Sequence, residues 1–173
     1  MIIIRIIVRR KIHFKNKRIK RLVLILLVLI LALFILLFYL IFSTKKTVCT
    51  FESNQKDYQI STKYKIYSKN DLVTKVISKS IVESSSTKVL KEMEQNINKQ
   101  YKILNDKYSG YDYKVKVRDK KLISVIKIDY KKYNMKDFIR ENGAMRAYVN
   151  INKQYTLDGA KEYYKSIGAT CNN

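Results

Sequence analysis

The stretch DYQISTKYKIYSKNDLVTKVISKSIVES, residues 57–84, decides the fold. In its first half, one set of alternate side chains is Tyr58, Ile60, Thr62, Tyr64 and Ile66, and the other is Gln59, Ser61, Lys63 and Lys65. This period of two is typical of a strand with one face in water. Asn70 and Asp71 tolerate tight backbone geometry and predict a turn into a second strand over residues 72–84. The stretch therefore predicts an antiparallel hairpin, preceded by a shorter strand around Cys49.

Residues 84–110 change to a helical period. Apolar side chains three or four residues apart form one stripe, consisting of Leu90, Met93, Ile97, Tyr101, Leu104 and Tyr108. Ser85 or Ser86 can cap the start of this helix, and Gly110 suits its end. We expect the helix to lie across the sheet. Such regular spacing favours core packing over a cofactor site for the stripe.

The remaining residues predict a second hairpin and two short helices. Residues 111–118 and 122–130 alternate around a turn near Asp119 and Lys120. Two short helices are expected, one capped by Asn134 and closed by Gly143, the other capped by Thr156 and ended by Gly168. The order β-ββ-α-ββ-α-α indicates an α+β class, a small antiparallel sheet with helices on one face.

Residues 22–42, LVLILLVLILALFILLFYLIF, contain neither a charge nor a glycine. At about 1.5 Å per residue, a helix of this length crosses a hydrocarbon core of about 30 Å. Before it lie nine cations and no acid, namely Arg5, Arg9, Arg10, Lys11, Lys15, Lys17, Arg18, Lys20 and Arg21. By the positive-inside rule this predicts a basic cytoplasmic tail (1–21), a single transmembrane helix (22–42), a short linker (43–48) and an extracytoplasmic domain (49–173) at the cytoplasmic membrane.

Two other readings of the N-terminal region are weaker. A cleaved signal peptide usually has an apolar core of about 7 to 15 residues and a small-x-small site, and residues 41–44 fit such a site poorly, so we expect a retained signal-anchor. The basic tail resembles a nucleic-acid arm in composition, but beside a span its charges set topology and touch anionic headgroups, so no nucleic acid is expected as a partner. His13 has no cysteine or acid beside it and predicts no metal site.

The chain has two cysteines, Cys49 and Cys171. Cys49 stands beyond Lys46, Thr47 and Val48, without the small apolar residues that a lipid-attachment site needs directly before it. Zinc sites usually have four ligands, and these two cysteines have no histidine near them. In an exported domain, one cysteine at each end favours a disulfide over both alternatives.

Four segments resemble, in order, the YehR-like family of bacterial lipoproteins, an extracytoplasmic domain of unknown function. They are TKYKIYSKNDLVTKV (62–76), YSGYDYKVKV (108–117), VIKIDY (125–130) and YYKSIGA (163–169). The resemblance covers roughly residues 49–171 and implies a small α+β domain held at the membrane. This chain differs in having a span in place of a lipid-attachment box, and the family supplies no catalytic residue.

The sequence predicts no catalytic, cofactor-binding or metal-binding residues, and we expect no enzyme. The exported part has no histidine, so a serine nucleophile would lack the usual base. Asp112, Asp119 and Asp129, the last beside Tyr130, are conceivable acids, but turns and surface ion pairs explain them more simply. No phosphate-binding glycine loop is present.

The formal net charge of the chain is +22, and several of its cations lie at alternate positions in the predicted strands. A cationic sheet face for anionic envelope polymers or lipid headgroups is predicted from Lys63, Lys65, Lys75, Lys79, Lys114, Lys116 and Arg118. An ordinary solvated face is the alternative. The preferred hypothesis is a membrane-anchored, non-catalytic binding or interaction module of the cell envelope, with an unspecified protein partner. An accessory subunit acting through its transmembrane helix and, less favoured, a small envelope hydrolase are the alternatives.

Overall fold

The computed structural model describes the backbone of residues 17–42 and 44–172 and the side chains of residues 23–37 and 44–172. His13 and most of the basic tail predicted over 1–21 lie outside the described residues. The chain divides after residue 43 into two compact units.

The first unit contains helix α1 (Lys17–Phe42). Its large apolar side chains between Leu24 and Leu37 are exposed, at 44% to 66% of their full surface. No helix in the described part of the chain is long and apolar enough to cross a membrane. The transmembrane helix expected over residues 22–42 therefore stays a prediction from the sequence.

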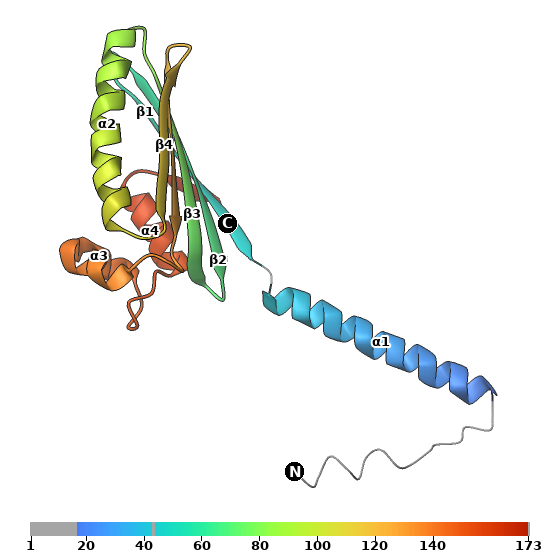
Figure 1. Cartoon of the computed structure of the whole chain (residues 1–173). Helices are drawn as coiled ribbons and strands as arrows, with labels where there is room; N and C mark the ends of the chain where they lie inside the picture. The colour runs from blue at the N-terminus through green and yellow to red at the C-terminus, as the bar shows by residue number, and fades with distance from the viewer. Residues whose placement is uncertain (1–16, 43, 173) are drawn as a thin grey trace. The chain divides into compact units, whose positions relative to one another are not determined.

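The second unit is built on one antiparallel sheet (Figure 1). Its strands are β1 (Lys45–Asn54), β2 (Gln59–Lys69), β3 (Leu72–Glu83), β4 (Tyr111–Arg118), β5 (Lys121–Asp129) and β6 (Thr170–Asn172), in the order β4-β5-β3-β2-β1-β6. Both predicted hairpins are confirmed, and each has a two-residue turn with positive φ. The φ angles are 50° and 58° at Asn70 and Asp71, and 51° and 57° at Asp119 and Lys120. Such turns match the twist of the strands they join.

The helices are α2 (Thr87–Lys107), α3 (Met135–Glu141), a 3₁₀ helix η3 (Gly143–Tyr148) and α4 (Leu157–Ser166). The predicted caps are confirmed, because the side chains of Ser86, Asn134 and Thr156 accept hydrogen bonds from the backbone N–H groups three residues later. Gly110 and Gly168 follow α2 and α4 with φ of +83° and +88°. The predicted α+β class is thus confirmed.

The structure differs from expectation at the start of one strand and in the presence of another. β1 begins at Lys45, so most of the residues expected as a linker (43–48) belong to the sheet. Strand β6 was not expected at all. Polar residues in KKTVCTFESN weaken the alternation of β1, and three residues are too few for β6 to show a period.

The helices cover one face of the sheet, and the core lies between the two layers. Tyr113 of β4 contacts Tyr101 of α2, and Tyr64 of β2 contacts Tyr164 of α4. The two clusters of buried side chains consist only of residues from the second unit. Since residues 44–173 have their own sheet and core, we treat them as an independent folding unit.

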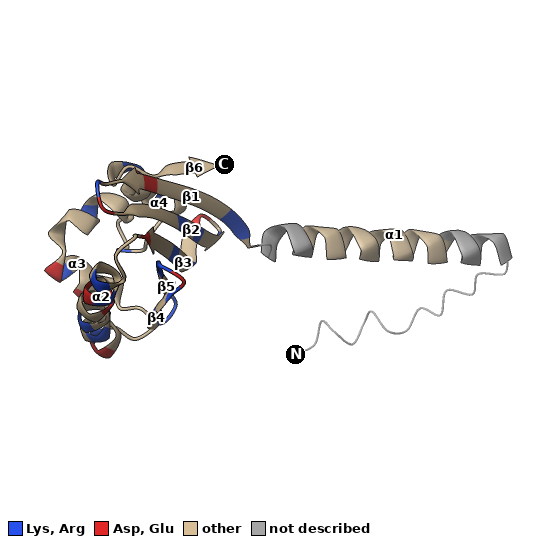
Figure 2. Ribbon diagram, turned by 90° about the horizontal axis from the view of Figure 1, so that it is seen from above, with Lys and Arg blue, Asp and Glu red and all other residues tan. Residues whose placement is uncertain are grey.

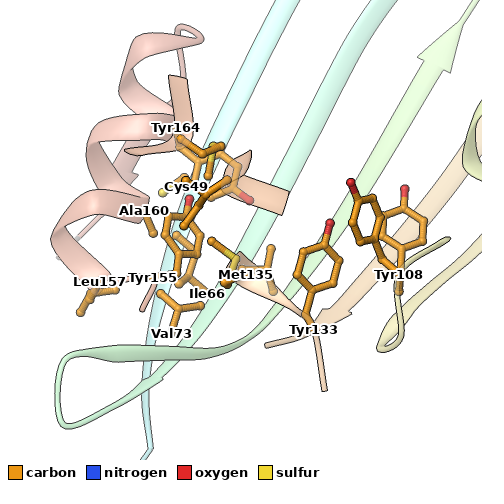
Figure 3. Packing of buried hydrophobic residues seen from close by; sticks show 14 of the residues in the cluster. Cys49, Ile66, Val73, Tyr108, Tyr133, Met135, Tyr155, Leu157, Ala160 and Tyr164 are labelled. Carbon is orange, nitrogen blue, oxygen red and sulfur yellow. The ribbon is translucent and has the colours of Figure 1, made fainter. Parts of the chain in front are cut away.

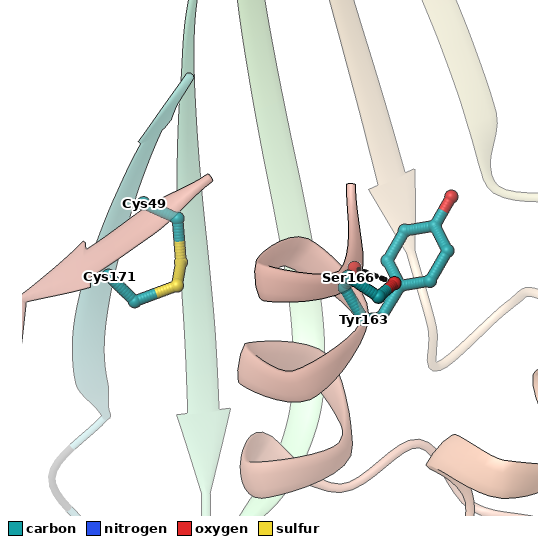
Figure 4. The surroundings of a disulfide bond; sticks show 4 residues. All are labelled: Cys49, Tyr163, Ser166 and Cys171. Carbon is teal, nitrogen blue, oxygen red and sulfur yellow. Dashed lines mark hydrogen bonds between the residues drawn. A yellow bond between two sulfur atoms is a disulfide. The ribbon is translucent and has the colours of Figure 1, made fainter. Parts of the chain in front are cut away.

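The predicted disulfide between Cys49 and Cys171 is present (Figure 4). The two residues are directly opposite each other in β1 and β6, and their Cα atoms are 3.9 Å apart. The Cys49 side chain is fully buried. Neither cysteine is therefore free for lipid attachment or for zinc.

Candidate functional site

The predicted basic residues of β2 and β3 lie on one face of the sheet. Directly opposite residues in antiparallel strands point to the same side. The register pairs Lys63 with Lys79 and Tyr67 with Lys75, while Lys65 is two residues from Lys63. Tyr64, between these lysines, points instead to the helices. These four lysines thus lie on the uncovered face.

The same register extends this face to β4. Lys79 is opposite Val125 of β5, and Val125 is opposite Lys114. Lys116 and Arg118 follow Lys114 at intervals of two. The structure therefore brings all seven predicted cations onto one face. We define the basic sheet face as Lys63, Lys65, Lys75, Lys79, Lys114, Lys116 and Arg118, together with Lys46, Lys121 and Lys127.

Three cations of the basic sheet face pair with carboxylates, namely Lys121, Lys127 and Arg118, the last with Asp119. Lys121 Nζ lies 2.7 Å from Glu83 Oε1, and Lys127 Nζ lies 3.9 Å from Asp112 Oδ2. Both pairs are about half exposed, so each stabilises the fold only weakly. Lys75 Nζ lies 4.7 Å from the ring centre of Tyr67, in a cation–π contact.

The centre of the face carries unneutralised positive charge. Lys63 and Lys79 are directly opposite each other on neighbouring strands. Within the described residues, no ion pair involves Lys63, Lys65, Lys79, Lys114 or Lys116. Like charges directly opposite each other destabilise a sheet, so this arrangement costs stability unless an anion binds there.

Basic residues are not restricted to the sheet, since Figure 2 also shows them along α2. Lys88, Lys91 and Lys99 are exposed on that helix, in the layer that covers the other side of the sheet. They provide a matched set of cations away from the basic sheet face.

Replacing Lys79 by glutamate is expected to stabilise the domain by about 0.5–1 kcal/mol, because it turns the repulsive pair with Lys63 into an attractive one. Lys79→Gln, which removes only the repulsion, is expected to give a smaller gain. Urea unfolding of the three proteins at low salt measures the difference. A loss of stability in both variants would show that Lys63 and Lys79 do not repel each other.

The structure does not gather the conceivable catalytic carboxylates around a cleft. Asp112 and Asp129 lie on the uncovered face, where Asp112 pairs with Lys127 and Asp129 Oδ1 accepts the Lys131 N–H. Asp119 lies in a turn, next to Arg118. No group of three or more histidine, cysteine or acidic side chains suited to a metal occurs among the described residues.

A second feature, which sequence reasoning missed, lies between the sheet and the helices. It is a cavity of about 230 Å³, here named the tyrosine cavity. Its lining consists of Tyr64, Val76, Ser78, Ser80, Tyr101, Ile126, Ile128, Tyr130, Phe138, Met145, Tyr155, Tyr163, Tyr164 and Ile167. Apolar periodicity predicts that such residues are buried, but not that a space remains among them. The content of 14 tyrosines without a tryptophan was the only available signal.

Burial controls the ionisation of this aromatic region. Desolvation raises the pKa of the Tyr155 and Tyr164 phenols well above the usual tyrosine range, and neighbouring tyrosines, Tyr163 among them, raise the pKa of each phenol further. Tyr130 is affected in the same direction, again mainly by desolvation. These hydroxyl groups therefore stay neutral at physiological pH.

The comparisons with known proteins identify the fold. No family model and no curated protein matches the chain. The NMR structure of E. coli YehR is similar, with a TM-score of 0.50 and 18% identity over 75% of this chain and 92% of YehR. The NMR structure of a protein from Streptococcus pneumoniae TIGR4 has a TM-score of 0.46 and 10% identity over 75% and 86% of the two chains. About 75% of this chain thus has a YehR-like fold.

Proposed function

We propose that this chain is a membrane-anchored, non-catalytic binding module of the bacterial cell envelope, whose basic sheet face contacts phosphate-rich or other anionic groups. The observation that carries this proposal is the Lys63–Lys79 pair, which has no carboxylate partner. Cations kept together at a cost in stability are expected where an anionic ligand compensates for their repulsion.

The proposed location rests on the sequence and on the disulfide. The apolar stretch over 22–42 follows a basic tail, an arrangement that directs the following domain out of the cytoplasm. Disulfides persist in oxidising compartments, which fits an extracytoplasmic domain closed by Cys49 and Cys171. We also propose membership of the YehR-like lipoproteins, supported by the four similar segments, with the span replacing the lipid.

Binding to anionic surfaces tests the basic sheet face. The domain 44–173 is expected to bind vesicles rich in anionic lipid at low salt, to bind neutral vesicles far less, and to lose affinity as salt rises. Changing Lys63, Lys79 and Lys114 to glutamine should weaken binding at least about tenfold, since each lysine near such a surface contributes about 1 kcal/mol.

The control changes Lys88, Lys91 and Lys99 of α2 to glutamine, which should leave most of the binding intact. Soluble polyphosphate in place of vesicles separates recognition of phosphate from recognition of a bilayer. Equal losses of affinity in the sheet and helix variants would show that binding depends only on the net charge of the domain. That result would reject the proposal.

A further inference from the structure

The tyrosine cavity is a partly open space lined by the domain's own elements. β2, β3 and β5 supply its floor, with Tyr64, Ser78 and Ile126 among the lining residues. α2, α3, η3, α4 and the connecting segments supply its walls. No charged side chain lines the cavity. It is smaller than the roughly 300–1,000 Å³ typical of drug-sized ligands.

Contacts between tilted and edge-to-face aromatic rings fix the shape of the cavity. The ring centres of Tyr64 and Tyr164 are 4.2 Å apart, and those of Tyr130 and Tyr155 are 5.1 Å apart. Tyr163 and Tyr164 are 5.3 Å apart and meet nearly edge to face. Such arrangements are attractive in themselves and hold the rings in place. The space among them is therefore preformed and presents aromatic faces and edges.

Polar groups in the lining lack partners. Tyr155 and Tyr164 are only 3% and 6% exposed, and Figure 3 shows both among the buried hydrophobic side chains. Within the described residues, neither hydroxyl makes a hydrogen bond, and the hydroxyl of Ser78, a side chain 9% exposed, makes none either. Among the described residues, the only fully buried side-chain polar atom without a partner is Ser68 Oγ. Tyr155, Tyr164 and Ser78 line the cavity, so their hydroxyls can bond to a molecule held there.

We propose that the tyrosine cavity binds a small neutral aromatic molecule that carries one or two hydroxyl or N–H groups. The aromatic lining matches a flat ring, and the unpaired hydroxyls match its polar groups. A carboxylate or phosphate has no cation to meet in the cavity, so anions are excluded. A sugar has more hydroxyl groups than this mainly apolar lining can satisfy.

Phenol and indole serve as probes of the domain 44–173, with benzoate and glucose as comparisons. Titration followed by NMR is expected to give saturable shifts for phenol or indole at residues of α4 and β3, with a dissociation constant of about 1 mM or tighter. Benzoate and glucose are expected not to bind there. Absence of saturable binding by both phenol and indole would overturn the proposal, leaving a cavity that holds only water.

Two variants test the role of the hydroxyls. Tyr155→Phe and Tyr164→Phe keep the rings and should preserve stability, but should weaken phenol binding about fivefold or more while leaving toluene binding unchanged. Tyr148→Phe is the control, because its hydroxyl contacts Ser166 and its ring does not line the cavity. Equal effects of all three variants on phenol, or equal effects on phenol and toluene, would reject the assigned contacts. Because no lysine of the basic sheet face takes part, this outcome is independent of the proposed function.

Discussion

Breaking the disulfide between Cys49 and Cys171 is expected to lower the free energy of unfolding by about 3–5 kcal/mol. The bond closes a loop across 122 positions of the sequence. In the chain-entropy model, a loop of this length stabilises the folded state by about 5 kcal/mol, since it restricts the unfolded chain. The bond also holds β6, a strand of three residues, against β1. Domains of this size often have a total stability of only about 5–15 kcal/mol, so the loss is a large share.

Urea unfolding of the domain 44–173 with and without dithiothreitol measures this effect. Cys49→Ala with Cys171→Ala is the companion variant, because alanine leaves no unpaired hydroxyl at the fully buried position 49. This variant should unfold at lower urea and should not respond to the reductant. Equal unfolding midpoints for oxidised and reduced wild type would contradict the proposed contribution.

Substituting Gly159 by alanine is expected to destabilise the domain by about 2 kcal/mol. Gly159 is buried in the first turn of α4, where its N–H donates to Thr156 Oγ1 at 3.0 Å. An added Cβ would collide with the carbonyl oxygen of Tyr148. Relieving such a clash typically costs about 1–3 kcal/mol or more, which outweighs the gain of about 1 kcal/mol that alanine brings to a helix.

Gly143 provides the matched control. A Cβ at this position has no atom within 4 Å, so Gly143→Ala should change stability by no more than about 0.5 kcal/mol. Thermal and urea unfolding of both variants give the comparison. Should Gly159→Ala be as stable as Gly143→Ala, α4 and the segment at Tyr148 would not pack as closely as the structure has them.

The sequence was sufficient for most of the fold because its local signals agree with one another. Alternation at Tyr64 and Lys65 separates a covered from an uncovered face, and the turn residues Asn70 and Asp71 adopt the positive φ angles that a tight hairpin needs. β6 could not be predicted, because its three residues form a strand only through pairing with β1, which is more than 100 residues away.

The candidate site was predictable where it depends on alternation, and hidden where it depends on packing. Cations at alternate positions within a strand lie on the same face of the sheet. The basic sheet face therefore follows from the pattern wherever the strands pair so that these positions of β2, β3 and β4 share a side. That Lys63 is opposite Lys79 depends on the exact pairing of β2 with β3. The tyrosine cavity depends on side chains from several elements failing to fill the space between them, which no linear pattern expresses.

NMR titration of the domain 44–173 with a soluble short-chain polyphosphate at low ionic strength tests the central claim most directly. The account predicts that the largest amide shifts occur in β2, β3 and β4 around Lys63, Lys79 and Lys114, and that they diminish as salt is added. Shifts centred on α2, or no shifts at any salt concentration, would contradict the claim that the uncovered face of the sheet is the anion-binding surface.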